Sequence, residues 1–357
     1  MATLGSEKKI KAVVFHQGAL GDFLIAASAI DELADGSAGI CIDFWSKPEH
    51  VALLTGKSYA GECHSADGAL VACLFQDSLW RTVALPDFLL KADLVLIFGQ
   101  TGSRVMAERL DGRLSANVCW IQSFPASDNT EMHVSEFLRR QLIGFGRPIS
   151  GKPLRLSPPV DEIQAARDLL HRLGIFSPPI LVHPGSGGRR KVWPLRNWHG
   201  LIEWMRSKLP CRVLLSIGPA DEYMDEFSRT MRDAGVPIVS GLPLLRLAAL
   251  LSLCALYVGS DSGVSHLAAA VGVPTIAVFG PTDPEVWGPR GSNVATVRRS
   301  WKEADVFACT PLGQSPQMTR SGIEESPVGT WSSFRDKEIT GLVLAMIRGR
   351  DPGEPYL

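Results

Sequence analysis

Polar side chains cluster at four places where an apolar, strand-like run gives way to a helical pattern. Small residues accompany them, so the backbone can turn tightly and present unpaired N–H groups to a ligand. If the runs are parallel strands, their carboxyl ends meet at one edge of a sheet, where such sheets bind ligands. The four segments are HQGALGD (16–22), HPGSGGRRKVWP (183–194), IGPADEYM (217–224) and VGSDSGVSHL (258–267).

The first segment combines two glycines with a carboxylate. Gly18 and Gly21 allow a tight turn, and Asp22 would lie at its mouth. Alternatively, Asp22 only caps the helix that follows. A dinucleotide-binding turn needs the spacing GxGxxG, which this segment lacks, so a nicotinamide-dependent oxidoreductase is disfavoured.

The second segment joins a glycine–serine cluster to three consecutive cations. Ser186 and Gly187 belong to the cluster, and Arg189, Arg190 and Lys191 follow it. Such a loop can hold a diphosphate with backbone N–H groups and positive charge. The alternative is an exposed basic turn. The Walker pattern GxxxxGK[ST] is absent, because the lysine follows an arginine and precedes a valine.

Two adjacent carboxylates mark the third segment. Asp221 and Glu222 follow an apolar run and open a helical pattern. A carboxylate at the tip of a strand suits the vicinal hydroxyls of a ribose. Acidic residues at the start of a helix are also explained by the helix dipole, so both interpretations stay open.

The fourth segment begins a helix with small residues. The N–H groups of Ser262, Gly263 and Val264 can hold phosphate oxygens, and Asp261 and His266 lie on the same approach. His266 could instead be a structural histidine. The rest of the helix is almost entirely Ala, Leu and Val, so we expect it to be buried with only its N-terminus exposed.

Short apolar runs alternate with helical patterns along the chain, which is typical of α/β folds with parallel sheets covered on both faces. We predict strands at 11–15, 41–45, 94–98, 117–121, 179–183, 212–217, 255–259 and 274–279. We predict helices at 22–34, 102–110, 132–145, 161–173, 196–208, 221–234, 244–253, 264–271 and 338–349.

The length of 357 residues favours two domains, on a prior of roughly 100–200 residues each. We predict a first doubly wound domain at 1–150 and a second at 161–334, joined by a proline-containing linker at 151–160. A closing helix and tail are predicted at 335–357.

The overall charge is close to zero but unevenly divided. The chain has 36 Lys and Arg against 37 Asp and Glu, net −1, which argues against a nucleic-acid partner. Residues 1–150 hold 13 basic and 17 acidic side chains, net −4, and residues 151–357 hold 23 and 20, net +3. If one half binds a polyanion, we expect it to be the second.

Composition also bears on location and on metals. Seven scattered cysteines without a CxxC pair predict neither a disulfide framework nor a zinc site, and we expect most of them in the core. The N-terminus lacks the apolar region of a secretory signal, so we expect a cytoplasmic location. The apolar run 242–258 contains Pro243 and Arg246 and is predicted to be a buried helix followed by a buried strand.

The combined pattern resembles glycosyltransferase family 9, the ADP-heptose:lipopolysaccharide heptosyltransferases. The resemblance covers both halves in the family's order and is most specific in the second. It rests on GALGD (18–22), HPGSGGRRKVWP (183–194), GPADE (218–222), GSDSGVSHLAAAVGVPTIAVFGPTDP (259–284) and GP (288–289).

The resemblance implies the GT-B architecture, in which two Rossmann-like domains face a cleft. The N-terminal domain would hold the acceptor and the C-terminal domain the nucleotide sugar, in agreement with the charge division. It also implies inverting transfer without a metal or another cofactor. A monomer is expected, with at most peripheral contact with the inner membrane.

The same resemblance implies roles for individual residues. Asp22 matches the general base that deprotonates the acceptor hydroxyl, in a loop whose Gly18 and Gly21 would face the acceptor. Lys191 matches the lysine that neutralises the departing diphosphate, and Glu222 the acid that binds the ribose. The other donor-binding positions are Ser186, Gly187, Asp261, Ser262, Gly263, Val264 and His266, of which Asp261 and His266 are also expected to be catalytic.

Two departures concern the acceptor. Basic residues that many members carry in the acceptor domain are not matched here, because this half is net −4, and CTPLGQ (309–314) lacks a second cysteine common in part of the family. The expected reaction is heptose transfer from ADP-heptose to a saccharide such as lipopolysaccharide core. Transfer from another nucleotide sugar, a nucleotide-sugar epimerase or hydrolase, and a non-catalytic nucleotide-binding protein remain alternatives.

Overall fold

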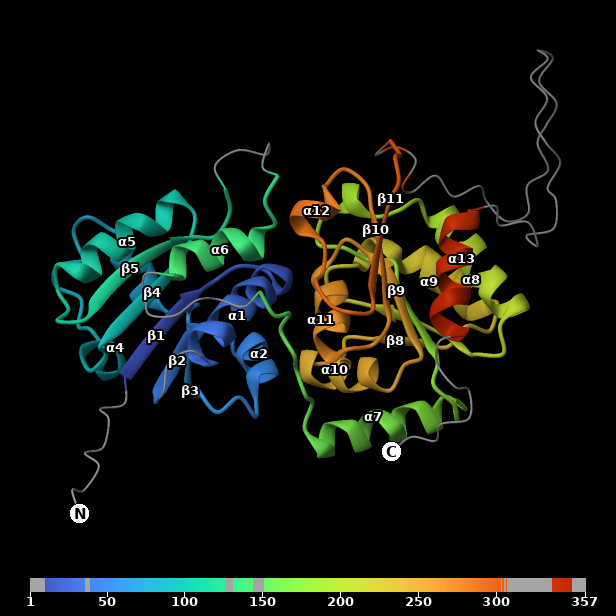
Figure 1. Ribbon diagram of the computed structural model, residues 1–357, viewed down its shortest axis with the longest axis horizontal. Coiled ribbons are helices and arrows are strands. Elements are labelled where there is room, and N and C mark those ends of the chain that lie inside the picture. The colour runs from blue at the N-terminus through green and yellow to red at the C-terminus, as the bar shows by residue number, and fades with distance from the viewer. Residues whose placement is uncertain are drawn as a thin grey trace, which may run out of the picture.

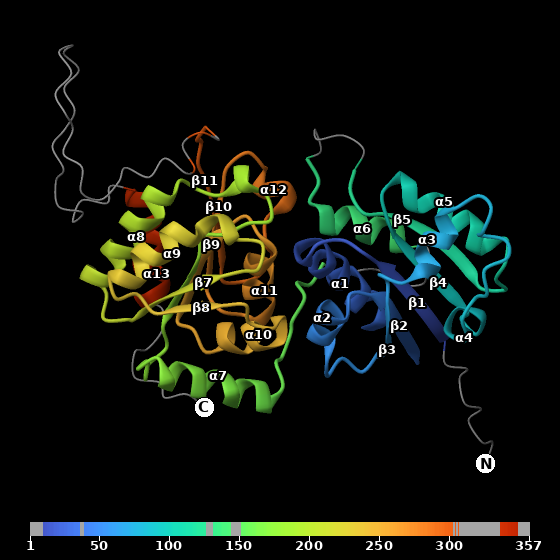
Figure 2. The ribbon, with the colours of Figure 1, turned by 180° about the vertical axis from the view of Figure 1, so that it is seen from behind.

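The computed structural model describes residues 10–35, 39–125, 131–143, 151–302, 304, 306 and 336–348. Within these residues the chain forms two parallel β-sheets that lie side by side, each covered by helices on both faces (Figure 1). Figure 2 shows the same two layered bodies from behind. The predicted α/β class with two doubly wound sheets is therefore confirmed.

The first sheet has the strand order β3-β2-β1-β4-β5, with every pairing parallel. Successive residues of its central strand face opposite cores: Ala12 and Val14 on one side, Val13 and Phe15 on the other. Its strands are β1 (Ile10–His16), β2 (Ile40–Ser46), β3 (Ala60–Ser65), β4 (Leu94–Gly99) and β5 (Asn117–Gln122). The helices α1 (Leu20–Asp35), α2 (Pro48–Val51), η1 (Ala52–Leu54) and α6 (Val134–Leu142) cover one face, and α3 (Ala69–Phe75), α4 (Asp87–Leu90) and α5 (Thr101–Asp111) the other.

The second sheet has the order β11-β10-β9-β6-β7-β8 and is also parallel throughout. Its strands are β6 (Ile180–His183), β7 (Val213–Ile217), β8 (Ile238–Ser240), β9 (Leu256–Ser260), β10 (Thr275–Phe279) and β11 (Val294–Arg298). The helices α7 (Val160–Arg172), α10 (Leu244–Ser252) and α11 (Gly263–Val271) pack on one face, and α8 (Leu195–Lys208), α9 (Asp225–Asp233) and α13 (Lys337–Arg348) on the other. The short helices η3 (Arg189–Lys191), η4 (Glu222–Met224) and α12 (Pro284–Trp287) lie in the loops.

One hydrophobic core continues from the first sheet into the second. It includes Phe23 and Leu24 of α1 and Leu267 of α11, and these two helices lie against each other (Figure 1). Two glycines permit this approach, because a Cβ on Gly263 would lie 2.8 Å from the backbone nitrogen of Gly21. The two sheets are therefore packed together at the start of both helices.

All eight predicted strands are present, with ends that move by no more than one residue. Sequence analysis missed β3, β8 and β11. These lie at or beside a sheet edge: β3 is largely exposed, β8 has only three residues and β11 is mostly half-buried. They therefore need no continuous apolar run, which was the signal used to find strands.

Most predicted helices are present, with two differences. The helix expected at 221–234 is divided into η4 and α9. The helix expected at 132–145 corresponds to α6, which begins at Val134, and residues 144–150 lie outside the described part of the chain. Of the expected linker, residues 151–159 contain no helix or strand and lead into α7. The domain boundaries themselves stay a prediction. The closing helix α13 packs on the second sheet through Ile339 and Val343.

The expectation that most cysteines lie in the core is wrong for the described residues, of which Cys254 is buried and Cys73, Cys119 and Cys211 are half-buried. Cys41, the second residue of β2, and Cys63, on the edge strand β3, are exposed. Cys309 lies outside the described residues. The run 242–258 contains α10 and the buried start of β9, as predicted. Among the helices that the structure describes, none combines the length and apolarity needed to span a bilayer.

Candidate active site

Three charged side chains that follow β1, β6 and β9 in the chain come together where α1 meets α11. Lys191 and Asp261 belong to the second sheet, and Asp22 approaches them from the first with electrostatic interactions to both. In the second sheet, β6 and β9 are neighbours from which the strand order runs in opposite directions. Such a switch point is where doubly wound sheets bind ligands.

Lys191 and Asp261 form the central ion pair. Nζ of Lys191 lies 3.0 Å from Oδ2 of Asp261, and the carboxylate is buried with an exposed fraction of 5%. The hydroxyl of Thr282 also donates to this carboxylate, and the Oγ of Ser186 donates to the Asp261 carbonyl at 2.7 Å. The structure therefore brings together Ser186, Lys191 and Asp261 of the predicted donor-binding set, with Thr282 added.

Asp22 occupies the third position of α1 and is not the N-cap that sequence analysis considered as an alternative. Its Oδ2 accepts a hydrogen bond from the Ala19 backbone nitrogen at 3.3 Å. Burial raises the pKa of Asp22; the bond from Ala19 and the charge of Lys191 oppose this shift, and Asp261 adds to it. A carboxylate with a raised pKa in this position is suited to accept a proton.

The N-terminus of α11 has the arrangement expected of a phosphate-binding helix. Ser262 is the N-cap with an extended backbone, Gly263 begins the helix, and Val264 is half-buried against the shared core. The first turn is held by Ser265, whose Oγ donates to the Ser260 carbonyl at 2.6 Å and lies 3.0 Å from the Tyr257 hydroxyl. The buried hydroxyls of Ser265 and Tyr257 thus stabilise the first turn of α11 from the protein interior.

His266, predicted to bind the donor and to be catalytic, is an uncharged group in the structure. Burial lowers its pKa to about 4, and Lys191 adds to this effect, although Asp261 and a hydrogen bond to the Trp287 backbone oppose it. The imidazole is therefore neutral near pH 7 and is oriented by Trp287. Its Cδ2 would lie 3.6 Å from a Cβ on Gly21, so it lies directly behind the first glycine loop.

The two carboxylates of the third segment have different surroundings. Glu222 is exposed at the start of η4, where it is open to a ligand. Asp221 is buried with an exposed fraction of 2% and accepts a hydrogen bond from Gly218 N at 2.8 Å. The explanation through the helix dipole does not fit Asp221, because its carboxylate points into the protein.

The remaining glycines have different neighbours. Gly187 is exposed in the loop after β6, and a Cβ there would meet nothing within 4 Å. A Cβ on Gly18 would lie 2.8 Å from the His16 ring and 3.2 Å from Oδ2 of Asp22. Gly18 therefore allows the turn to fit between these side chains, and Gly21 faces α11 of the other sheet.

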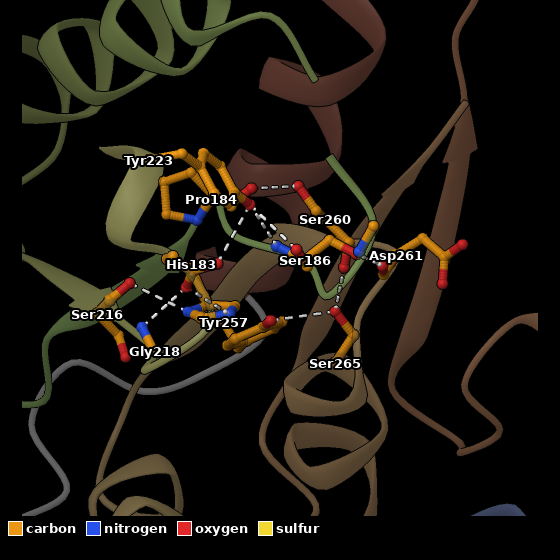
Figure 3. Close-up of polar contacts among 12 residues, drawn as sticks. His183, Pro184, Ser186, Ser216, Gly218, Tyr223, Tyr257, Ser260, Asp261 and Ser265 are labelled. Carbon is orange, nitrogen blue, oxygen red and sulfur yellow. Dashed lines mark hydrogen bonds and ion pairs between the residues drawn. The ribbon is translucent and has the colours of Figure 1, made fainter. Parts of the chain in front are cut away.

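Sequence analysis missed Thr282, Tyr223 and His133. Tyr223 hydrogen-bonds the backbone of Ser186 and the carboxylate of Asp221 (Figure 3). His133 links the two sheets, because its Nε2 donates to the Gly288 carbonyl at 2.8 Å and its Nδ1 accepts from Ser135 N. Tyr223 lies within IGPADEYM (217–224) and Thr282 within GPTDP (280–284), so both carried a sequence signal, whereas His133 lies outside the quoted motifs.

In the ranges that the structure describes, no group of three or more His, Cys, Asp or Glu side chains could hold a metal ion. The polar groups that do gather are a cation, two carboxylates and a helix N-terminus, which together suit an anionic ligand and a proton transfer.

Comparison with known proteins identifies the family. The family model for glycosyltransferase family 9 (heptosyltransferase) matches residues 123–312, more than half of the chain. Lipopolysaccharide heptosyltransferase 1 of Salmonella typhimurium (strain LT2) is 31% identical over 173 residues, which is 46% of this chain and 52% of that protein. For the first three curated relatives the alignments span 41%, 37% and 39% of their length.

Solved structures agree in fold. A glycosyl transferase family 9 structure from Veillonella parvula has a TM-score of 0.69 at 16% identity, covering 96% of this chain and 99% of that one. An E. coli heptosyltransferase solved with ADP has a TM-score of 0.59 at 17% identity, covering 84% of this chain and 96% of that one. The two doubly wound domains are thus those of the GT-B architecture, and the chain belongs to glycosyltransferase family 9.

Proposed function

We propose that this protein transfers L-glycero-D-manno-heptose from ADP-heptose to a saccharide acceptor such as lipopolysaccharide core. The observation that carries the proposal is the meeting of Asp22 from one sheet with Lys191 and Asp261 of the other. Family membership supports heptosyl transfer, and the ADP bound to the related E. coli enzyme supports an adenine nucleotide.

The donor occupies the second sheet in this proposal. Its diphosphate lies against Ser186 and Gly187 on one side. On the other side the backbone N–H groups of Ser262, Gly263 and Val264, at the N-terminus of α11, donate to the phosphate oxygens. The exposed carboxylate of Glu222 binds the ribose hydroxyls. The net charge of +3 in this half favours the anionic donor.

The reaction is a single inverting displacement. The acceptor oxygen forms a bond to the anomeric carbon while its proton passes to the Asp22 carboxylate. The bond between the anomeric carbon and the diphosphate oxygen breaks, and the electron pair leaves with the nucleoside diphosphate. Lys191 and the α11 N-terminus stabilise the charge that develops there, so the protein supplies this stabilisation without a metal ion.

Asp261 and His266 position the groups around the reacting sugar in this proposal. Asp261 holds the Lys191 ammonium at 3.0 Å, and the neutral His266 presents an uncharged ring beside the sugar. The acceptor enters over Gly18 and Gly21 of the first sheet. Because that half is net −4, an acceptor with few phosphates fits better than a heavily phosphorylated core.

The cellular setting belongs to the same proposal. The protein acts as a monomer in the cytoplasm and meets a lipid-linked acceptor by peripheral contact with the inner membrane. Neither a metal nor another cofactor takes part.

The test is a panel of nucleotide sugars with and without saccharide acceptors, read by mass spectrometry of products and by nucleoside diphosphate release. We expect an acceptor-dependent heptosylated product with ADP-heptose. Release of ADP without any acceptor would instead support a hydrolase, and a changed sugar without release an epimerase. Absence of turnover with every donor would contradict the proposal.

A further inference from the structure

We propose that Asp221 and Tyr223 are positioning residues for donor binding, which hold the loop 184–188 in its diphosphate-binding form from beneath. The proposal rests on the proposed donor site and adds two residues that would not themselves contact the sugar. Figure 3 shows both ends of this arrangement, with Tyr223 and Gly218 on one side of Ser186 and Asp261 on the other.

The Asp221 carboxylate is anchored inside the second domain. It is 2% exposed, and Gly218 N donates to its Oδ2 at 2.8 Å. Nε2 of His183 lies 3.8 Å from the same oxygen, and burial lowers the pKa of that histidine. His183 is therefore neutral, with Nδ1 donating to the Ser216 carbonyl at 3.0 Å, and Asp221 is held by neutral donors.

Tyr223 connects the Asp221 carboxylate to the loop 184–188. Its hydroxyl lies 3.2 Å from Oδ1 of Asp221 and 3.0 Å from the Ser186 carbonyl, and it accepts a hydrogen bond from Ser186 N at 3.3 Å. Burial raises the pKa of Tyr223 to about 12, so the phenol keeps its proton near pH 7. The single hydroxyl proton is shared between the Ser186 carbonyl and the Asp221 carboxylate, while the hydroxyl oxygen accepts from Ser186 N.

Close packing shows that the loop is fitted to Asp221. A Cβ on Gly185 would lie 2.1 Å from Oδ2 of Asp221, so only glycine lets the backbone pass over the carboxylate. On its other side the loop is tied by Ser186 Oγ to the Asp261 carbonyl at 2.7 Å. Ser186 is therefore fixed from both sides.

The Tyr223 ring also reaches the basic end of the loop. The guanidinium carbon of Arg189 lies 5.2 Å from the ring centroid, within the range of a cation–π contact. Arg189 begins η3, which ends at Lys191. Asp221 and Tyr223 thus support both the N–H groups and the cations that would face the diphosphate.

This arrangement predicts an effect on donor binding that exceeds the effect on chemistry. A loop that must be ordered by the ligand binds it less tightly, whereas Asp22 and the Lys191–Asp261 pair remain in place. Tyr223→Phe removes only the hydroxyl and keeps the ring under Arg189. Asp221→Asn keeps the shape and removes the charge.

The experiment measures ADP binding to the full chain by calorimetry, and kcat and KM with ADP-heptose. For Tyr223→Phe we expect ADP affinity to fall about fivefold to tenfold, the loss typical of one or two buried hydrogen bonds. KM should rise by a similar factor while kcat stays within about twofold. Asp221→Asn should likewise lower ADP affinity and raise KM.

Tyr59→Phe is the matched control. Tyr59 is a buried tyrosine of the first domain whose phenol has its pKa raised by burial and by the nearby Asp31, so its replacement can change stability without touching the donor loop. ADP affinity should equal that of the parent protein. Unchanged affinity in Tyr223→Phe, or an equal loss in Tyr59→Phe, overturns the inference while the proposed function stands. A parent protein that binds no nucleoside diphosphate overturns both.

Discussion

Asp22 has two roles that favour opposite charge states: accepting a hydrogen bond from Ala19 N favours the ionised carboxylate, whereas a general base must take up a proton. Its carboxylate completes the first turn of α1 through the Ala19 nitrogen, and burial raises its pKa. The positive charge of Lys191 limits this rise in pKa, because it favours the ionised carboxylate. The result is a carboxylate that binds a proton more readily than an exposed aspartate.

Replacement of this carboxylate tests the assignment. Asp22→Asn keeps an acceptor for Ala19 N and removes the base, so kcat should fall by about 10²–10⁴-fold while ADP affinity is retained. Because the ionised form is active, kcat/KM of the parent protein should decline as pH falls, with an apparent pKa above ~3.9, the ordinary Asp value. Loss of ADP binding with unchanged kcat would contradict the role of base.

The individual residues of the site were predictable to different degrees. Lys191 and Asp261 follow neighbouring strands of one parallel sheet, so the topology predicts that they meet, whereas Asp22 follows a strand of the other sheet and only the family resemblance placed it opposite them. Asp221 and Glu222 are neighbours in the same kind of segment, and sequence does not say which one points inward. That choice depends on η4 and on the hydroxyl of Tyr223, which are contacts of the folded chain.

Among the elements, α1 and α11 determine how closely the two halves of the site approach. Their first turns meet at Gly21 and Gly263, and a Cβ on Gly263 would lie 2.8 Å from both Gly21 N and the Leu20 Cβ. Neither glycine has a positive φ, so the requirement is for space and not for an unusual backbone conformation. Asp22 follows Gly21 directly, so this packing sets its distance from Lys191 and Asp261.

Gly263→Ala should therefore separate the two helices. Overpacking at a closed contact typically costs about 1–3 kcal/mol of unfolding free energy, and kcat should fall because Asp22 is displaced. Gly341→Ala is the matched control, because Gly341 lies in α13 with open space around its Cβ position. That change should gain roughly 0.5–1 kcal/mol and leave kcat unchanged. Equal unfolding midpoints for both variants would contradict the contact.

The elements themselves were largely predictable because buried parallel strands are continuous apolar runs. β1, β6 and β9, which precede the site, are central strands of this kind. The edge strands β3, β8 and β11 and the short loop helices were not found, since elements such as β3 and α12 gain their structure from neighbours and not from a local pattern. The strands that position the site are thus the ones that sequence reveals best.

At the scale of the whole molecule, burial joins the two domains into one core. Residues of α1 and α6 share a cluster with α10 and α11, so the interface is continuous with the interiors of both domains. The opposite net charges of the two halves, −4 and +3, also favour their association. The sequence predicted two domains but not this shared core, because periodicity reports which face of a helix is apolar and not what covers it.

His133 gives this interface a dependence on pH. Its neutral imidazole donates to the Gly288 carbonyl of the second domain, and burial, aided by Arg290, His266 and Arg139, lowers its pKa to about 4. His266 on the other side also has its pKa lowered to about 4. An unfolded histidine titrates near ~6.5, so the unfolded chain binds protons first as the pH falls.

The stability that His133 contributes should therefore be present above ~pH 6.5 and be lost between ~6.5 and ~4. His133→Gln keeps a donor for Gly288 but does not titrate, so its unfolding free energy should fall less between about pH 7 and about pH 4.5 than that of the parent protein. Urea titrations at both pH values measure the difference. Because other buried histidines titrate in both proteins, only the difference between them reports on His133. Equal losses in the two proteins would show that protonation of His133 does not weaken the contact between the domains.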